Sequence, residues 1–358
     1  MALEVTRMTP LLYTLHSGNL YGTERMALAT IQALGPEWDP IIFSPPGPVI
    51  AEARRLGLGA VEIHNDREFF HAIQPWFSHS RRLAVFSTRV VHSLLVCAVN
   101  LLYRRRIAHL HMVHGGADEA LSYGQKRRMN HLPVTLVAVS EFVRDRLLVH
   151  GVNPKRIRVI ENFLTSERVA SAPRRPQFAA SGLREAIVIS RLDPIKRIDL
   201  LLDALETHPE LKHLRVRLFG KGSDEQKLQK RAQKAQLSIT FEGFSTLVDQ
   251  ALADSDVLIH CCDQEPFGLA ILEAMAANVP VIVPDKGGAG SLIDPGRTGL
   301  RFESGDAASL AARLTQFNEA TPKYLNRLTA NAAEVLGTRF SQRERVADYR
   351  RVIEEALA

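Results

Sequence analysis

Residues 256–275 read DVLIHCCDQEPFGLAILEAM, and this stretch decides how the rest of the chain is interpreted. The apolar run up to His260 predicts a buried strand, the residues around Glu265 predict a loop, and a helix is predicted from near Leu269. Glu265 precedes that helix and Glu273 lies one turn inside it. Two carboxylates facing one site are good acceptors for sugar hydroxyls. The alternative is a helix-capping Glu followed by a surface Glu.

The loop before this helix also offers backbone donors. The N–H groups of Phe267, Gly268 and Leu269 are free at a helix start, where oxygen-rich or anionic groups bind well. Gly268 lacks a Cβ, so a ligand can approach the backbone closely. Together with Pro266 and Glu265, these residues form a candidate binding loop.

Short apolar runs alternate with amphipathic stretches along most of the chain. The predicted strands span residues 11–16, 83–87, 107–113, 134–140, 186–190, 215–219, 256–260 and 279–283. The predicted helices between them include 24–34, 141–150, 198–206 and 269–276. Several strands are nearly continuous in Val, Ile and Leu, which is typical of parallel sheets covered on both faces. The sequence therefore predicts an α/β fold with two Rossmann-like, doubly wound domains facing a cleft.

One stretch interrupts this alternation. Residues 166–182 are rich in Ala, Ser, Pro and Arg and show no clear period, so they predict a linker. The expected domains are then 1–165 and 183–340. A final helix over 341–358 is expected to pack back toward the N-terminal domain.

Composition bounds the function. The 358 residues are 46% hydrophobic and 23% charged, as in ordinary globular proteins. The longest apolar stretch, 90–103, is too short for a membrane span, and the N-terminus lacks the pattern of a secretion signal. The three cysteines are Cys97, Cys261 and Cys262, which favours a reducing, cytoplasmic location.

The net charge of +6 is concentrated in residues 79–131. The basic residues of this segment are Arg81, Arg82, Arg89, Arg104, Arg105, Arg106, Lys126, Arg127 and Arg128. Such a cluster suggests an anionic partner, for example a membrane surface, and a solvated face is the alternative. Few aromatic residues accompany these cations, so nucleic acid is not expected.

Residues 187–199 read IVISRLDPIKRID. A strand is expected to end at Ser190, and Arg191 and Lys196 follow it in a loop before a helix. Two cations beside a helix N-terminus suit a diphosphate, although exposed basic residues are the alternative interpretation.

Histidines raise the question of a metal site. His109, His111 and His114 lie at a strand end, but no carboxylate cluster accompanies them. The adjacent residues of the run 260–263 cannot all converge on one ion. We therefore expect no metal at either place.

The run 265–276, followed by NVPVIV over 278–283 and by Gly287-Gly288, resembles the donor-site signature of glycosyltransferase family 4, whose members are retaining enzymes of the two-domain GT-B fold. The resemblance implies that Glu265 binds hydroxyls of the donor sugar and that Glu273 holds the ribose. Arg191 and Lys196 match the family's diphosphate clamp, with Ser190 and Arg197 replacing its glycines.

The resemblance extends to other turns. Gly220 lies in a G-x-G turn, Gly243 and Phe244 match a loop that reads the nucleobase, and His114 occupies the position of a catalytic histidine near C6 of the sugar. Gly22 matches a glycine of the family's G-G-x-E turn that approaches a phosphate, although Tyr21 replaces its neighbour.

The implied activity is retaining transfer of a sugar from a nucleotide-diphosphate sugar to a hydroxyl of a glycan or a lipid-linked acceptor. The N-terminal domain would bind the acceptor and the C-terminal domain the donor, without a metal or other cofactor. The protein would be cytoplasmic, with residues 79–131 resting on the inner membrane face. A nucleotide-sugar epimerase of the same fold, a glycoside hydrolase using Glu265 and Glu273, and a nucleic-acid-binding protein are the alternatives.

Overall fold

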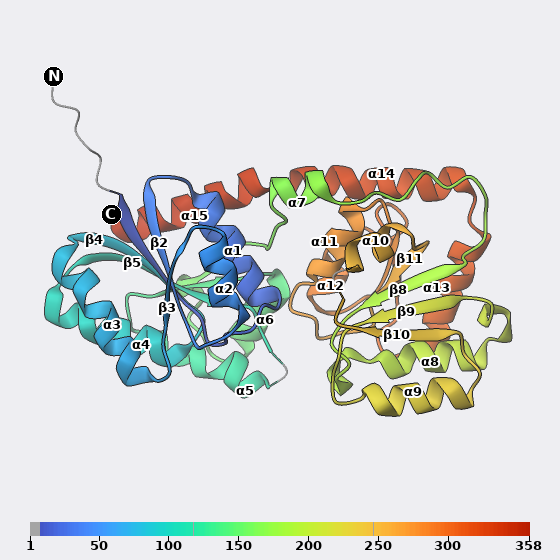
Figure 1. Cartoon of the computed structure of the whole chain (residues 1–358), viewed down its shortest axis with the longest axis horizontal. Helices are drawn as coiled ribbons and strands as arrows, with labels where there is room; N and C mark the ends of the chain where they lie inside the picture. The colour runs from blue at the N-terminus through green and yellow to red at the C-terminus, as the bar shows by residue number, and fades with distance from the viewer. Residues whose placement is uncertain (1–7, 117, 246) are drawn as a thin grey trace, which may run out of the picture. The chain divides into compact units, whose positions relative to one another are not determined.

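The computed structural model describes residues 8–116, 118–245 and 247–358, which form two compact units (Figure 1). The first unit comprises the described residues up to Phe163 together with Gln342–Ala358, and the second comprises Leu164–Ser341. Each unit is built on one fully parallel sheet. The α/β prediction is therefore confirmed.

The sheet of the first unit has the order β3-β2-β1-β4-β5-β6-β7. Its strands are β1 (Thr9–Thr14), β2 (Trp38–Ser44), β3 (Gly59–Glu62), β4 (Arg82–Ser87), β5 (Arg106–Val113), β6 (Thr135–Ala138) and β7 (Ile157–Val159). Its helices are α1 (Gly22–Leu34), α2 (Pro48–Arg55), α3 (Asp66–His79), α4 (Val90–Tyr103), α5 (Glu119–Ser122), α6 (Glu141–Val149) and α15 (Gln342–Leu357), with 3₁₀ turns η1 (Gly124–Met129) and η2 (Pro154–Arg156).

Apolar side chains from strands and helices fill the core of the first unit. Phe43 of β2, Phe69 of α3 and Val85 of β4 are fully buried and belong to one cluster. The last helix, α15, packs on α1 and β5, and its Tyr349 ring stacks on Phe86 of β4. Residues at the end of the chain therefore complete the core of the first unit.

The sheet of the second unit has the order β10-β9-β8-β11-β12-β13. Its strands are β8 (Glu185–Ile189), β9 (Arg215–Phe219), β10 (Ile239–Gly243), β11 (Val257–Ile259), β12 (Val281–Pro284) and β13 (Leu300–Phe302). Its helices are α7 (Ser166–Ser171), α8 (Ile198–Thr207), α9 (Glu225–Lys234), α10 (Val248–Ala253), α11 (Leu269–Ala276), α12 (Gly287–Ser291), α13 (Ala307–Glu319) and α14 (Pro322–Thr338), with 3₁₀ turns η3 (Pro194–Lys196) and η4 (Pro209–Leu211). Helices α8 and α9 lie on one side of this sheet, and α10 and α11 lie on the other (Figure 1).

The stretch expected to be a linker differs from the prediction, because it belongs to the second unit and begins with helix α7. The guanidinium of Arg175 donates to Asp256 over 2.6 Å and stacks on the Phe178 ring. The backbone N–H of Arg175 also bonds the carbonyl of Ala277. The contacts of Arg175 hold this segment against the second unit. A single arginine gives no periodic pattern, so the sequence did not reveal this packing.

Candidate functional site

In the second unit, the strand order reverses between β8 and β11, and the loops that follow these two strands are neighbours. The chain winds outward from β8 to β10 and then returns to the other side of β8 with β11. In parallel sheets, such a switch point opens a crevice beyond the carboxyl ends of the two strands. The loop after β8 carries Arg191 and Lys196, and the loop after β11 carries Glu265.

Lys196 and Glu265 form a buried ion pair across these two loops. Lys196 Nζ donates to Glu265 Oε2 over 2.7 Å, and the two side chains are only 15% and 16% exposed. Burial raises the pKa of Glu265, but the charge and hydrogen bond of Lys196, together with His260 and the backbone N–H of Phe267, lower it below its ordinary value. Burial would likewise lower the pKa of Lys196, but the Glu265 carboxylate raises it. Both groups are therefore ionised at neutral pH.

His260 stands beside the Glu265 carboxylate, with Nε2 3.6 Å from Oε2. Burial lowers the pKa of His260 to about 4, so the ring is neutral at pH 7. One ligand atom each from His260, Cys262 and Glu265 lie within 4.8 Å of one another, a spacing that could hold a metal ion. However, the Lys196 ammonium occupies the same Glu265 oxygen, and burial raises the pKa of the Cys262 thiol to about 11. Because an ammonium is already paired with this carboxylate, the arrangement fits a buried ion pair better than a cation site.

The loop around Glu265 is fixed by its backbone. Gly288 N–H donates to the carbonyl of Glu265 over 2.7 Å. A Cβ on Gly288 would lie only 2.1 Å from the Pro266 carbonyl oxygen, so the loop requires a glycine there. Phe267 is 2% exposed and packs edge-on against Phe340, and its backbone N–H donates to the Glu265 carboxylate.

Gly268 precedes α11, which begins at Leu269 as expected. Gly268 adopts a φ of +106°, in the left-handed region that favours glycine. The N–H groups of the first turn of α11 are therefore presented directly after the Glu265 loop.

Arg191 lies near the ion pair but is not part of it. Its Nη1 contacts Asp193 Oδ2 at 2.6 Å, and half of the side chain is exposed. Its positive charge opposes protonation of Lys196, which places it within electrostatic reach of that ammonium. The two cations of the predicted clamp therefore share one loop.

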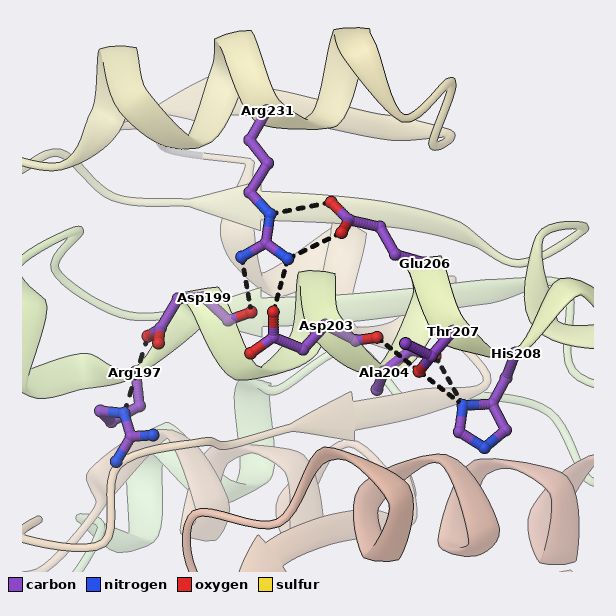
Figure 2. A network of polar contacts seen from close by, with 8 residues as sticks. All are labelled: Arg197, Asp199, Asp203, Ala204, Glu206, Thr207, His208 and Arg231. Atoms are coloured by element: carbon purple, nitrogen blue, oxygen red, sulfur yellow. Dashed lines mark hydrogen bonds and ion pairs between the residues drawn. The ribbon is translucent and has the colours of Figure 1, made fainter.

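Helix α8, which follows the loop that carries Lys196, is joined to α9 by ion pairs of Arg231. Figure 2 shows Arg231 of α9 reaching both Asp203 and Glu206 of α8, with Arg231 Nε 2.8 Å from Glu206 Oε1. Arg197 enters α8 with a φ of +54°. This is the position where the family has glycine, and the left-handed backbone explains that preference.

Glu273 lies in α11 with partners of its own. Arg168 of α7 approaches Glu273 Oε1 at 3.4 Å and also forms a two-pronged ion pair with Asp249. Sequence analysis missed Arg168, because it lies in the stretch taken for a linker. His260 was considered from the sequence only as part of the run 260–263, and its place beside Glu265 was not foreseen.

The remaining candidates of the second unit lie at the carboxyl ends of β9 and β10. Gly220 N–H donates to the carbonyl of Gly243 over 2.9 Å. A Cβ on Gly220 would lie 1.9 Å from the Ser190 carbonyl oxygen, so this glycine lets the loop after β8 approach. The Phe244 side chain is 65% exposed beside them.

The other two candidates, Gly22 and His114, belong to the first unit. Gly22 begins α1, where Tyr21 N–H donates to the buried Glu24 carboxylate over 3.0 Å. His114 follows β5, and burial lowers its pKa to about 4, so it is neutral.

His109 and His111 are fully buried side chains of β5. Each lies near the hydroxyl of Ser87, and Ser93 contacts His111 Nδ1 at 2.8 Å. The two imidazoles and the two serine hydroxyls therefore form a polar network in the core of the first unit.

The basic segment does not form one patch, contrary to expectation. Arg82 and Arg106 are neighbours at the amino ends of β4 and β5, whereas Arg89 follows the carboxyl end of β4. Lys126 lies in η1, after the carboxyl end of β5. A strand rises about 3.3 Å per residue, so the two groups are separated by the length of the strands.

Comparison with known proteins bears on both halves of the chain. A model of glycosyl transferases group 1 matches residues 172–335, and a model of Glycosyltransferase Family 4 matches residues 20–168. A GDP-mannose-dependent alpha-mannosyltransferase of Mycolicibacterium smegmatis is 34% identical over 243 residues, which cover 68% of this chain and 60% of that protein. A protein of the same description from Mycobacterium tuberculosis is 27% identical over 239 residues, and the match spans 61% of its length.

Solved structures share the architecture. HepE of Anabaena in complex with UDP-glucose superposes with a TM-score of 0.81 at 17% identity, covering 97% of this chain and 99% of that one. The lipopolysaccharide outer core galactosyltransferase WaaB gives 0.75 at 15% identity, covering 97% and 99%. These likenesses show the fold. Because the two family models together extend from residue 20 to residue 335, we conclude that the chain belongs to the group 1 glycosyltransferases of GT-B fold.

Proposed function

We propose that this protein transfers a sugar, with retention at the anomeric carbon, from a nucleoside-diphosphate sugar to a hydroxyl acceptor. The buried Lys196–Glu265 pair at the switch point carries this proposal. An ammonium held in a poorly hydrated crevice can bind an anion strongly, and a carboxylate beside it can accept from sugar hydroxyls.

In this mechanism the protein orients the reactants and stabilises charge. Lys196 and Arg191 would hold the diphosphate, whose negative charge grows as it departs. Glu265 would bind hydroxyls of the donor sugar, and Glu273 those of the ribose. The backbone N–H groups of Gly268 and Leu269 would contact donor oxygens, while the N–H of Phe267 orients the Glu265 carboxylate. Gly22 is the proposed phosphate contact of the first unit.

No side chain is assigned as a nucleophile. The acceptor hydroxyl would lose its proton to a phosphate oxygen of the donor as the bond to the leaving diphosphate breaks. Neutral His114 would donate a hydrogen bond to the sugar without adding charge. The two cations would take the place of a metal, so chelation is expected to leave transfer unchanged.

The nucleobase is a separate question. The mycobacterial relatives are described as GDP-mannose-dependent, whereas HepE was solved with UDP and UDP-glucose. Gly243 and exposed Phe244 are the proposed base contacts.

Thermal unfolding with UDP-, GDP- and ADP-sugars tests the function. A ligand at 100 times its dissociation constant adds about 2.7 kcal/mol of stability. Product analysis of the stabilising donor then separates the alternatives, because an epimerase isomerises the sugar without an acceptor. Stabilisation by none of these donors would contradict the proposal.

The acceptor is proposed to be a glycan or a lipid-linked sugar, with the first unit resting on an anionic membrane. Leu101 and Leu102 at the end of α4 are 77% and 72% exposed. Exposed Arg104 and Arg106 follow them in the chain, and exposed Arg82 pairs with Arg106 across the sheet. Apolar side chains beside cations suit a lipid interface. Within the described residues, no helix has the length and apolar character needed to cross a bilayer.

Flotation with vesicles containing phosphatidylglycerol tests this docking. The L101S/L102S double variant should lose binding, whereas Val149→Ser, which changes an exposed residue of α6, should keep it. Equal flotation of all three proteins would contradict the membrane proposal.

A further inference from the structure

The first unit has its own switch point and a cavity beside it. The chain winds outward from β1 to β3 and returns to the other side of β1 with β4. A cavity of about 570 Å³ lies among residues that follow β1, β4 and β5. Its polar and charged lining residues are His16, Thr88, Arg89, His114, Ser122, Gln125 and Lys126. A ligand site is therefore expected here on topology alone.

The charge of this cavity is one-sided. Arg89 and Lys126 are cations, His16 and His114 are further nitrogen donors, and none of the described lining residues is a carboxylate. Burial lowers the pKa of His16, and the charges of Lys126 and Arg89 lower it further, whereas the carboxylate of Glu24, which is not a lining residue, raises it. An anion in the cavity would find several donors and no carboxylate among the described lining residues.

Lys126 is the least expected member of this set, because its side chain is buried but has no acidic partner among the described residues. The residue is 8% exposed, and Nζ donates to the carbonyl of Leu121 over 3.0 Å. A lysine ammonium carries three donors, and a buried charge is costly unless it is paired. Burial lowers its pKa to about 8, so it remains mostly charged at pH 7.

Two further polar features belong to residues that line the cavity. His114 Nε2 is buried and has no hydrogen-bond partner among the described residues. The first turn of α4 starts after Arg89 with no side-chain cap, so its N–H groups are available for an anion. Arg89 itself keeps one contact outside the cavity, to Asp66 at 2.5 Å.

We infer that this cavity is a subsite for a phosphate group of the acceptor, held by Lys126 and Arg89 at the start of α4. The inference rests on the proposed transferase function and specifies its acceptor as phosphorylated. His16 and Thr88, which are bonded to each other, form the wall next to the phosphate. The acceptor phosphate can belong to a soluble molecule or to a lipid headgroup, since both offer the same oxygens.

Calorimetric titration of the full chain with glycerol 3-phosphate, a soluble probe, tests the inference without any transfer reaction. We expect Lys126→Met to weaken binding at least about tenfold, since a charge-assisted hydrogen bond is lost. The matched control Lys155→Met, at an exposed position of the same unit, should bind like the wild type, and so should Lys196→Met. Circular dichroism would show that each variant is folded.

Three results would overturn the inference. They are unchanged binding by Lys126→Met, loss of binding in Lys196→Met instead, and displacement of the probe by UDP or GDP, which would assign the phosphate to the donor.

Vesicles with and without phosphatidylglycerol form the second arm. Lys126-dependent binding to the vesicles identifies a lipid source, and binding of the soluble probe alone identifies a soluble one. Failure of sugar transfer with intact Lys126-dependent binding would refute the proposed function and leave this subsite standing.

Discussion

Lys196 Nζ lies 2.7 Å from Glu265 Oε2, although the two residues are 69 positions apart in the sequence. They meet because β8 and β11, far apart in the chain, are neighbours in the sheet. The pair is satisfied before any ligand binds, so a donor must bring both a negative charge for Lys196 and hydroxyls for Glu265. A diphosphate sugar meets both requirements.

Replacing Lys196 should remove stabilisation of the departing diphosphate. We expect Lys196→Met to lower kcat by about 10²–10³, the usual effect of losing one preorganised contact at a developing anion. Steady-state kinetics with the stabilising donor measures this, with Lys323→Met as an exposed control. Wild-type turnover by a folded Lys196→Met protein would remove Lys196 from the mechanism.

Breaking the Lys196–Glu265 ion pair should also lower the free energy of unfolding. Breaking a buried pair from one side leaves an unpaired charge and costs about 3–5 kcal/mol, whereas removing both charges costs less. Urea unfolding of K196M, E265Q and the double variant should therefore be strongly non-additive. Additive losses would show that the two charges do not interact, and E265Q should in any case lose most transfer activity.

Arg168 should act through Glu273, which it contacts at 3.4 Å. We expect Arg168→Leu to raise KM for the donor about tenfold while changing kcat less, because Glu273 would lose an orienting partner and not its own hydroxyl contacts. Arg174→Leu, an exposed change nearby, is the control. An equal effect of both changes, or a loss confined to kcat, would contradict this role.

Lys126 gives a pH-dependent prediction. Burial lowers its pKa from 10.5 to about 8, so between these values the unfolded state binds more protons and the unfolding free energy rises with pH. Below pH 8 the buried charge opposes folding. Lys126→Met should therefore be more stable than the wild type at pH 7 by about 1–3 kcal/mol, and this advantage should shrink toward pH 10.5.

Urea unfolding in phosphate-free buffer across this pH range measures the difference. A Lys126→Met protein that is less stable at pH 7 would show that the ammonium is well paired.

Arg197 tests the backbone of the loop after β8. Its φ of +54° costs a non-glycine residue about 1–2 kcal/mol. Arg197→Gly should increase the unfolding free energy by about 0.5–1 kcal/mol, part of the gain being lost to the greater freedom of the unfolded chain. A destabilised variant would mean that contacts of the Arg197 side chain outweigh the backbone strain.

Much of the fold followed from apolar runs. The expected strands at 215–219 and 107–113 match β9 and β5 to within a residue, because most of their apolar residues are buried. Strands β7 and β13 were missed because Arg158 and Arg301 interrupt their three-residue apolar runs, whereas the equally short β11 is apolar throughout. Strand β2 was missed because Asp39 and Pro40 interrupt its apolar run.

The candidate site was foreseen in part. Lys196 and Glu265 were both identified, and their pairing depends on strand order, which the sequence does not reveal directly. Arg168 was hidden in a stretch without period, and the isolation of Lys126 depends on which side chains surround it. Contacts between distant segments were therefore the part that required the structure.

The central claim is that the switch point of the second unit binds a nucleoside diphosphate through Lys196. Calorimetric titration of the full chain with UDP, GDP and ADP tests it most directly. The account predicts that at least one of them binds and that Lys196→Met weakens it tenfold or more, while Lys126→Met leaves it unchanged. Binding of none of the three, or equal affinity in wild type and Lys196→Met, would contradict it.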